Sequence, residues 1–247
     1  MGHAMRLLFL GTGGYHPNER RHTAGLMLPE LGIVFDAGSS FFRVQPRLVT
    51  KELDVFLTHP HLDHIQGLTF FLVPLLLGTV TRCRIHADPA TIEAIQQHLF
   101  SQAVFPVIPS YEFVPLAERI EISGATITHT PLKHPGGSIG YLLEANGKRV
   151  AYITDTTVDG TYTDFIRGVD VLIHECYFPD EMAQWCEKTG HSHTSQVAKL
   201  AKEAGVGRLY LTHIDPQRPD DDPIDLATAQ RIFPATTLAE DLMEIEF

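Results

Sequence analysis

Short apolar runs alternate with polar stretches that contain glycine and proline along the whole chain. The runs at residues 6–10, 55–58 and 149–153 have the length and side-chain content of buried strands. Residues 91–100 and 195–204 instead place apolar side chains at helical spacing. We therefore expect strands and helices that alternate along the chain, as in α/β proteins.

Further elements follow the same pattern. Residues 26–28 and 33–35 form a predicted hairpin, and Gly205 is a predicted C-cap for the helix before it. Additional strands are expected at residues 125–130, 139–143, 171–173 and 208–211. No repeat or composition boundary interrupts the pattern, so we expect residues 1–247 to form one domain.

The first five residues, Met1 to Met5, contain a second methionine before the first apolar run. They are typical of a cloning remnant and lack the apolar stretch of a signal peptide. The longest apolar run, residues 68–77, contains Pro74 and is shorter than the roughly 20 residues that cross a membrane. We expect no membrane segment and a cytoplasmic location, with this run buried in the core or against a second copy of the chain.

Potential ligands follow four of the predicted strands, namely His59, Asp155, His174 and His213. The end of a strand holds a side chain rigidly at the rim of a sheet, where ligands gather in α/β proteins. The pattern therefore predicts that side chains far apart in the sequence meet at one edge of the fold. His174 is expected to be structural.

The densest group of ligands is the segment His59-Pro60-His61-Leu62-Asp63-His64. Imidazole and carboxylate groups are ligands that zinc, manganese and iron accept. His59 and His61 can grip one ion from one side of a tight loop, while Asp63 and His64 can turn toward a second. The spacing predicts a site for two divalent metal ions. Zinc is the expected metal, with manganese and iron left open.

This segment resembles the signature of the metallo-β-lactamase superfamily. The resemblance implies a four-layer αββα sandwich, with the metal site along one edge of two sheets. It also implies that Asp36 supports the metal-binding loop from behind. The resemblance assigns the other ligands: His134 completes the first ion, His213 completes the second, and Asp155 bridges the two.

The ribonuclease Z branch of the superfamily is the most similar one. Its opening resembles Leu10-Gly11-Thr12-Gly13-Gly14, and its His-Glu strand end resembles His174-Glu175. The resemblance implies that Glu175 and His191 protonate the leaving oxygen, with His193 as the alternative histidine, and that Asp63 orients the attacking water. Two features depart from the branch. The long arm that holds transfer RNA is replaced by a short hairpin at residues 146–147, and Cys176-Tyr177 stands where the branch has Ala-Thr.

The predicted activity is a metal-dependent hydrolase, most consistent with a phosphodiesterase that acts on a small or short nucleotide-type phosphodiester. A lactonase or thioesterase of the same superfamily and a true ribonuclease Z remain alternatives. The formal net charge is −11 and no cluster of lysine and arginine appears, which disfavours a large nucleic acid. The three cysteines have no Cys-x-x-Cys spacing and are expected to be reduced thiols. Relatives in this branch are commonly dimers, so the resemblance implies a homodimer.

Overall fold

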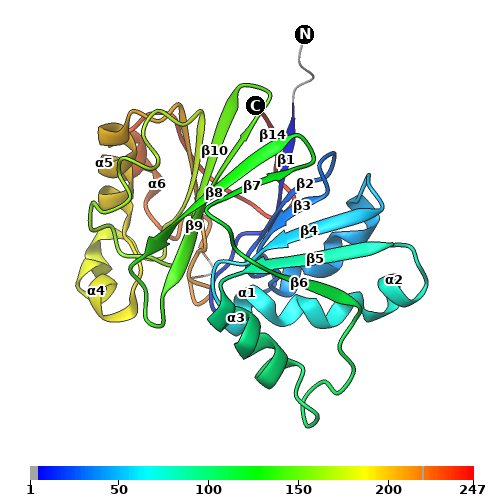
Figure 1. The fold of residues 1–247 in the computed structure, drawn as a ribbon. Coiled ribbons are helices and arrows are strands. Elements are labelled where there is room, and N and C mark those ends of the chain that lie inside the picture. The colour runs from blue at the N-terminus through cyan, green and yellow to red at the C-terminus, as the bar shows by residue number, and fades with distance from the viewer. Residues whose placement is uncertain (1–4, 219) are drawn as a thin grey trace.

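The computed structural model describes residues 5–218 and 220–247. Two seven-stranded sheets pack against each other, and helices cover the outer face of each sheet (Figure 1). The structure thus has four layers in the order helix, sheet, sheet, helix. This confirms the predicted αββα sandwich.

The first sheet combines residues from the beginning, the first half and the end of the chain. In spatial order its strands are β14 (Glu244–Glu246), β1 (Arg6–Gly11), β2 (Gly25–Leu28), β3 (Ile33–Phe35), β4 (Glu52–Phe56), β5 (Arg82–Ala87) and β6 (Tyr111–Pro115). Strands β3 to β6 run parallel to one another. The carboxyl ends of these strands therefore lie at the same edge of the sheet.

The second sheet is built from strands between residues 119 and 238. In spatial order its strands are β13 (Thr236–Leu238), β12 (Arg208–Thr212), β11 (Val171–Glu175), β10 (Lys148–Ile153), β9 (Ser138–Ala145), β8 (Ala125–Leu132) and β7 (Arg119–Ile122). Strands β10 to β13 are parallel, whereas β7 to β10 are antiparallel. Asn146 and Gly147 close the short hairpin between β9 and β10, as predicted, and both have positive φ.

The helices of the outer layers are short. They are α1 (Leu62–Ile65), α2 (Leu72–Leu76), α3 (Pro89–Ala94), α4 (Cys186–Thr189), α5 (Thr194–Ala204) and α6 (Leu226–Ile232), with 3-10 turns at Ser39–Arg43, Gln45–Arg47, Gln66–Phe71 and Asp180–Trp185. The predicted helix at residues 91–100 is α3 and a π-helical continuation, Ile95–Leu99. Gly205 ends α5 in the left-handed region, as predicted. Within the described residues, no helix is long and apolar enough to span a membrane.

Three apolar cores hold the four layers together. The central core lies between the sheets and includes Phe35 of the first sheet and Tyr141 of the second. A second core joins Leu172 of β11 to Val197 of α5. The third core joins the first sheet to its helices, for example Val55 of β4 to residues of the 3-10 turns. Strands such as β1 and β11 are therefore buried on both faces, which explains why they appear in the sequence as continuous apolar runs.

Two sequence expectations need correction. Residues 1–4 of the predicted cloning remnant lie outside the described residues, but Met5 is buried and its backbone exchanges hydrogen bonds with Phe247. Met5 therefore belongs to the fold. The strands between residues 82 and 122 were not predicted, because their alternation of apolar and charged residues, as in Arg82–Ala87, gives a weaker signal than a continuous apolar run.

The buried carboxylate of Asp54 on β4 allows a test of which interactions stabilise the first sheet. Asp54 is 2% exposed and accepts hydrogen bonds from Arg84 Nε and Nη2 at 2.5 and 2.6 Å and from His86 Nε2 at 2.8 Å. Burial would raise the pKa of Asp54, but these hydrogen bonds outweigh it and hold the pKa below its ordinary value. We expect Asp54→Asn to lower the free energy of unfolding by about 3 kcal/mol at pH 7, measured by urea denaturation.

The sign of the pH dependence follows from the lowered pKa. Because Asp54 binds its proton more weakly in the folded state, its stabilisation is present at neutral pH and is lost as the pH falls through the folded-state pKa. The difference in the free energy of unfolding between wild type and Asp54→Asn should therefore become smaller at acid pH. Glu112→Gln is the matched control, since the Arg82–Glu112 ion pair on the same sheet is about half exposed and should contribute less than about 1 kcal/mol. Equal effects of the two variants would contradict the prediction.

Candidate metal centre

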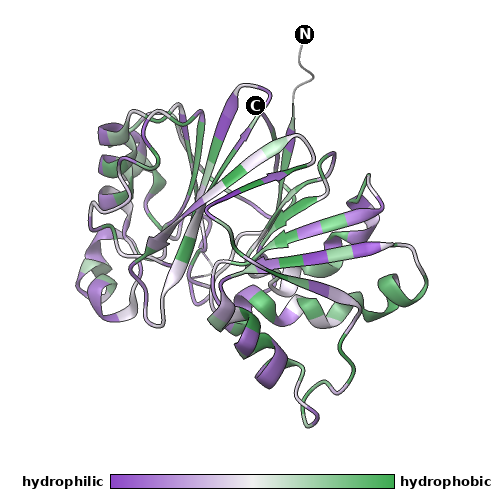
Figure 2. Ribbon diagram, in the orientation of Figure 1, coloured by the Kyte–Doolittle hydropathy of each residue, from purple (hydrophilic) through white to green (hydrophobic). Residues whose placement is uncertain are grey.

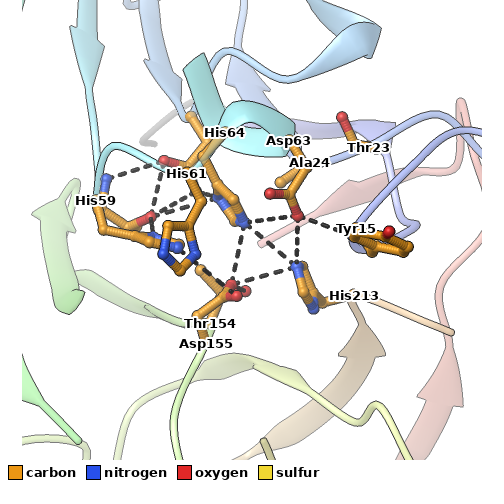
Figure 3. A network of polar contacts seen from close by, with 12 residues as sticks. Tyr15, Thr23, Ala24, His59, His61, Asp63, His64, Thr154, Asp155 and His213 are labelled. Atoms are coloured by element: carbon orange, nitrogen blue, oxygen red, sulfur yellow. Dashed lines mark hydrogen bonds and ion pairs between the residues drawn. The ribbon is translucent and has the colours of Figure 1, made fainter. Parts of the chain in front are cut away.

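The candidate metal centre lies where parallel strands of both sheets end. His59 comes three residues after β4, Asp155 two residues after β10, and His213 directly after β12. His134 lies in the turn between β8 and β9. The structure brings together all seven residues predicted as metal ligands, namely His59, His61, Asp63, His64, His134, Asp155 and His213, most of which are drawn in Figure 3.

The carboxylate of Asp155 lies between two groups of ligand atoms. Its Oδ1 is 3.8 Å from Nε2 of His59 and 3.8 Å from Nε2 of His134. Its Oδ2 is 3.1 Å from Nε2 of His64 and 3.3 Å from Nε2 of His213. One oxygen therefore faces each group, which is the arrangement that a bridging carboxylate requires.

The two groups correspond to the two predicted sites. His59, His61 and His134 have ligand atoms within 4.8 Å of one another, and so do Asp63, His64 and His213. Figure 3 shows the side chains of the second group converging with Asp155. Each group alone offers three candidate protein ligands, and Asp155 would add a fourth to each.

One ring nitrogen without a partner and two ring nitrogens that approach each other show that the side chains fit metal ions. His59 Nε2 is buried and has no hydrogen-bond partner among the described residues. The Nε2 atoms of His64 and His213 are 3.2 Å apart, so two ring nitrogens point at the same space. Burial lowers the pKa of His59 and of His134, which keeps these imidazoles in the neutral form that binds metals. The donor set of nitrogen and carboxylate oxygen fits a divalent metal centre.

Neighbouring groups fix the orientation of the ligands. Asp36 Oδ2 lies 2.9 Å from His64 Nδ1 and accepts a hydrogen bond from the hydroxyl of Tyr152, also at 2.9 Å. Its Oδ1 accepts from the backbone N–H of Thr58. The carbonyl of Gly190 lies 3.0 Å from His134 Nδ1. The contacts at Nδ1 of His64 and His134 orient both rings so that Nε2 faces the other candidate ligands. The sequence indicated the role of Asp36, but not those of Tyr152 and Gly190.

The backbone is strained at several of these positions. Asp36, Asp155 and His213 have φ values of 60, 52 and 56°, although none is a glycine. Such conformations cost on the order of 1–3 kcal/mol each and persist where the surroundings over-determine them. Each residue turns the chain just after a strand, and its side chain contacts the candidate ligand His64.

The glycine-rich turn after β1 packs against the site. A Cβ on Gly14 would lie 2.5 Å from Cε1 of the His213 ring, so only glycine allows this approach. The next residue, Tyr15, donates its backbone N–H to Asp63 Oδ2 at 2.8 Å and has a φ of 59°. The turn therefore orients Asp63.

Glu175 and His191 lie beside the proposed ligands. Glu175 Oε1 is 3.0 Å from His191 Nδ1, and Oε2 accepts the backbone N–H of Ser192 at 3.0 Å. Burial would lower the pKa of His191, but the charge of Glu175 outweighs it and raises the pKa to about 9. His193 instead contacts Asp180, with 2.8 Å between its Nδ1 and Oδ1. The geometry thus favours His191 over His193 as the partner of Glu175.

An open pocket of about 170 Å³ gives access to the centre. Besides ligand side chains it is lined by Tyr15, Pro135, Thr189 and His191. A larger pocket of about 450 Å³ lies beside α5, but no histidine lines it, so size alone does not locate the site.

Two other residues near the site are structural. His174 is fully buried, with Nε2 at 2.8 Å from the hydroxyl of Tyr162 and Nδ1 at 2.7 Å from the carbonyl of Glu175, as expected for a structural histidine. Cys176 is buried too, and burial raises the pKa of its thiol. All three cysteines are free and buried.

Comparisons with known proteins show the family to which the chain belongs. A model of the β-lactamase superfamily domain matches residues 32–214. Ribonuclease Z of Methanosarcina mazei is 30% identical over 304 aligned positions that cover 98% of each chain. The metallo-β-lactamase fold protein YhfI of Bacillus subtilis has a TM-score of 0.84 and 22% identity, covering 99% of this chain and 100% of its own. A diphosphatase of the PhnP family has a TM-score of 0.76 and 22% identity, covering 99% and 97%. This chain belongs to the metallo-β-lactamase superfamily, in its ribonuclease Z-like branch.

Proposed function

We propose that this protein is a dinuclear metal-dependent phosphodiesterase acting on small or short phosphodiesters. The observation that carries the proposal is the position of Asp155, with one carboxylate oxygen toward each of two groups of three ligands. Paired ligand groups that share a carboxylate suit two ions about 3.5–4 Å apart.

The ligands divide between the two proposed ions. His59, His61 and His134 would hold the first, and Asp63, His64 and His213 the second, with Asp155 shared. When bound, two divalent cations would neutralise phosphoryl charge and make water a stronger acid. Zinc is the proposed metal, because histidine nitrogen and carboxylate oxygen are its usual ligands in hydrolases, and manganese or iron accept the same donors.

Three side chains are proposed to take part in proton transfer. Asp63 lines the pocket, and the N–H of Tyr15 fixes one of its oxygens, so the carboxylate is placed to orient the attacking water and accept its proton. On another wall of the pocket, Glu175 holds His191 through Nδ1, which leaves Nε2 to protonate the leaving oxygen. A base and an acid at one pocket fit hydrolysis with a poor leaving group.

The relatives support phosphodiester chemistry and leave the substrate to be determined. Their names are ribonuclease Z and a diphosphatase of the PhnP family. The alignment to ribonuclease Z spans 304 positions, which exceeds the 247 residues of this chain by 57, so many positions face gaps here. These gaps, the tight β9–β10 hairpin and the net charge of −11 together favour a small substrate over transfer RNA.

The first experiment counts metals and compares ester classes. We expect about two divalent ions per chain by elemental analysis and cleavage of bis(p-nitrophenyl) phosphate that a chelator abolishes and zinc or manganese restores. Turnover of an acyl lactone without phosphodiester cleavage would instead support the lactonase or thioesterase alternative. Efficient cleavage of a transfer-RNA precursor would support a true ribonuclease Z. A metal-free protein that stays inactive after metal addition would refute the proposal.

We also propose a homodimer, formed through the apolar segment after His64. Figure 2 shows hydrophobic colour along α2, and Val73, Leu76 and Leu77 are 56, 78 and 71% exposed. Exposed apolar side chains gathered on one helix are typical of contact surfaces. A solution mass near the 27.5 kDa of one chain, measured by light scattering, would contradict the dimer.

We further propose that the whole chain forms one domain and that the protein is cytoplasmic. The ligands extend from His59 to His213 and come from both sheets, which supports one domain over the whole chain. The three free, buried cysteines fit the reducing conditions of the cytoplasm, the proposed location. Labelled protein found in an oxidising compartment would overturn that location.

A further inference from the structure

The ring of Tyr177 lies flat on the ring of His191. Their centroids are 4.5 Å apart and the planes differ by 13°. The same phenol ring is 5.8 Å from the ring of His213. Tyr177 is thus placed against the histidine proposed to act as the acid and near a proposed metal ligand. Its position is the second after β11, the strand that ends at Glu175.

The hydrogen bond to Glu175 does not fix the His191 ring alone. Glu175 is held firmly, because Oε1 accepts the backbone N–H of Thr156 at 2.6 Å and Oε2 accepts that of Ser192 at 3.0 Å. A single contact at Nδ1 fixes one atom of the imidazole, and the ring can still tilt about that contact. A flat neighbour on the ring face removes this tilt, and a stacked aromatic pair contributes about 0.5–1.5 kcal/mol beyond burial.

The backbone holds Tyr177 in place for this contact. Its N–H donates to the carbonyl of Ser192 at 3.1 Å, and the N–H of Phe178 donates to the same carbonyl at 3.2 Å. The segment that carries His191 is therefore tied to the segment that carries Tyr177. The contact between Tyr177 and His191 is one of ring face on ring face.

We propose that Tyr177 is a positioning residue that keeps His191 Nε2 aimed at the leaving oxygen of the phosphodiester, an inference that rests on the proposed function. In the reaction, the water oxygen forms the new P–O bond and releases one proton. The P–O bond to the leaving group breaks with its electron pair on oxygen, and that oxygen takes the proton of His191. The proton that water releases replaces the one that His191 has given up. The products are a phosphomonoester and an alcohol.

The leaving group distinguishes this role from a general loss of structure. Tyr177→Leu removes the aromatic face, and Tyr177→Phe keeps it. With methyl phenyl phosphate, whose leaving phenolate is a strong base, we expect kcat to fall about tenfold in the leucine variant at unchanged KM. With methyl p-nitrophenyl phosphate, whose leaving group needs little protonation, kcat should fall less than about threefold. The phenylalanine variant should match wild type with both esters.

A second measurement reports the stack without turnover. In zinc-loaded protein labelled at histidine, the ring protons of His191, assigned with His191→Gln, should be shifted by the ring current of Tyr177. The shift should remain in Tyr177→Phe and disappear in Tyr177→Leu. Loss of this shift in both variants, or equal loss of kcat with both esters, would overturn the proposal. If the wild type cleaves no phosphodiester, the proposed function fails, while the shift still shows whether the rings stack.

Discussion

Replacing Asp155 by asparagine is expected to lower phosphodiester cleavage by about a thousandfold or more and to reduce the bound metal below two ions per chain. The reason is that Asp155 has an oxygen toward each group of ligands, so loss of its charge weakens both at once. Asparagine is preferred to alanine as the replacement, because Asp155 has a φ of 52° and asparagine tolerates that backbone well. Elemental analysis and the rate with bis(p-nitrophenyl) phosphate measure the two effects.

Two control variants separate the bridging role from other effects of removing a carboxylate. Asp164→Asn changes an aspartate whose side chain is 90% exposed, and it should leave metal content and rate unchanged. Asp36→Asn removes the partner of His64 Nδ1 rather than a proposed ligand, and it should weaken metal affinity about 10- to 100-fold. If Asp155→Asn retained two ions and wild-type turnover, the bridging assignment would be wrong.

Much of the candidate site could be predicted from the sequence because its ligands follow local rules. Four of them fall within the segment from His59 to His64, where spacing alone indicates a metal. Asp155 and His213 follow apolar runs, and the ends of parallel strands meet at one edge of a sheet. The structure places these residues together as predicted. Whether they ligate two ions is what the Asp155 variant tests.

The parts that sequence reasoning did not reach depend on contacts between distant segments. Tyr152 reaches Asp36 across 116 residues, and Tyr177 is tied to the carbonyl of Ser192, the residue that follows His191. Spacing cannot rank His191 above His193 either. The two histidines differ in their partners, because His191 contacts Glu175 and His193 contacts Asp180. The tertiary fold sets these contacts.

The sequence does not predict the backbone strain, for a related reason. The positive φ values of Asp36, Asp155 and His213 occur at residues that do not demand them. Contacts with distant parts of the chain over-determine these turns. A sequence pattern therefore locates the strand end but not the direction in which its ligand points.

Replacing His191 by alanine is expected to lower kcat by about 10²- to 10⁴-fold with a poor leaving group and to leave two metal ions bound. His191 lines the pocket, and its Nδ1 is occupied by Glu175, so Nε2 is the nitrogen available to a leaving oxygen. Because His191 is proposed as an acid and not as a ligand, metal content separates its role from that of Asp155. Steady-state kinetics with methyl phenyl phosphate, together with elemental analysis, measure both quantities.

Glu175→Gln should lower kcat by a similar factor. Glutamine lacks the negative charge that orients the His191 ring and raises its pKa. The two losses should not add in the double variant, since the residues act as one unit. His193→Ala is the matched control, because its ring contacts Asp180 instead and kcat should stay within about twofold of wild type. Full additivity would show that Glu175 and His191 act separately. A large loss in His193→Ala with none in His191→Ala would transfer the acid role to the other histidine.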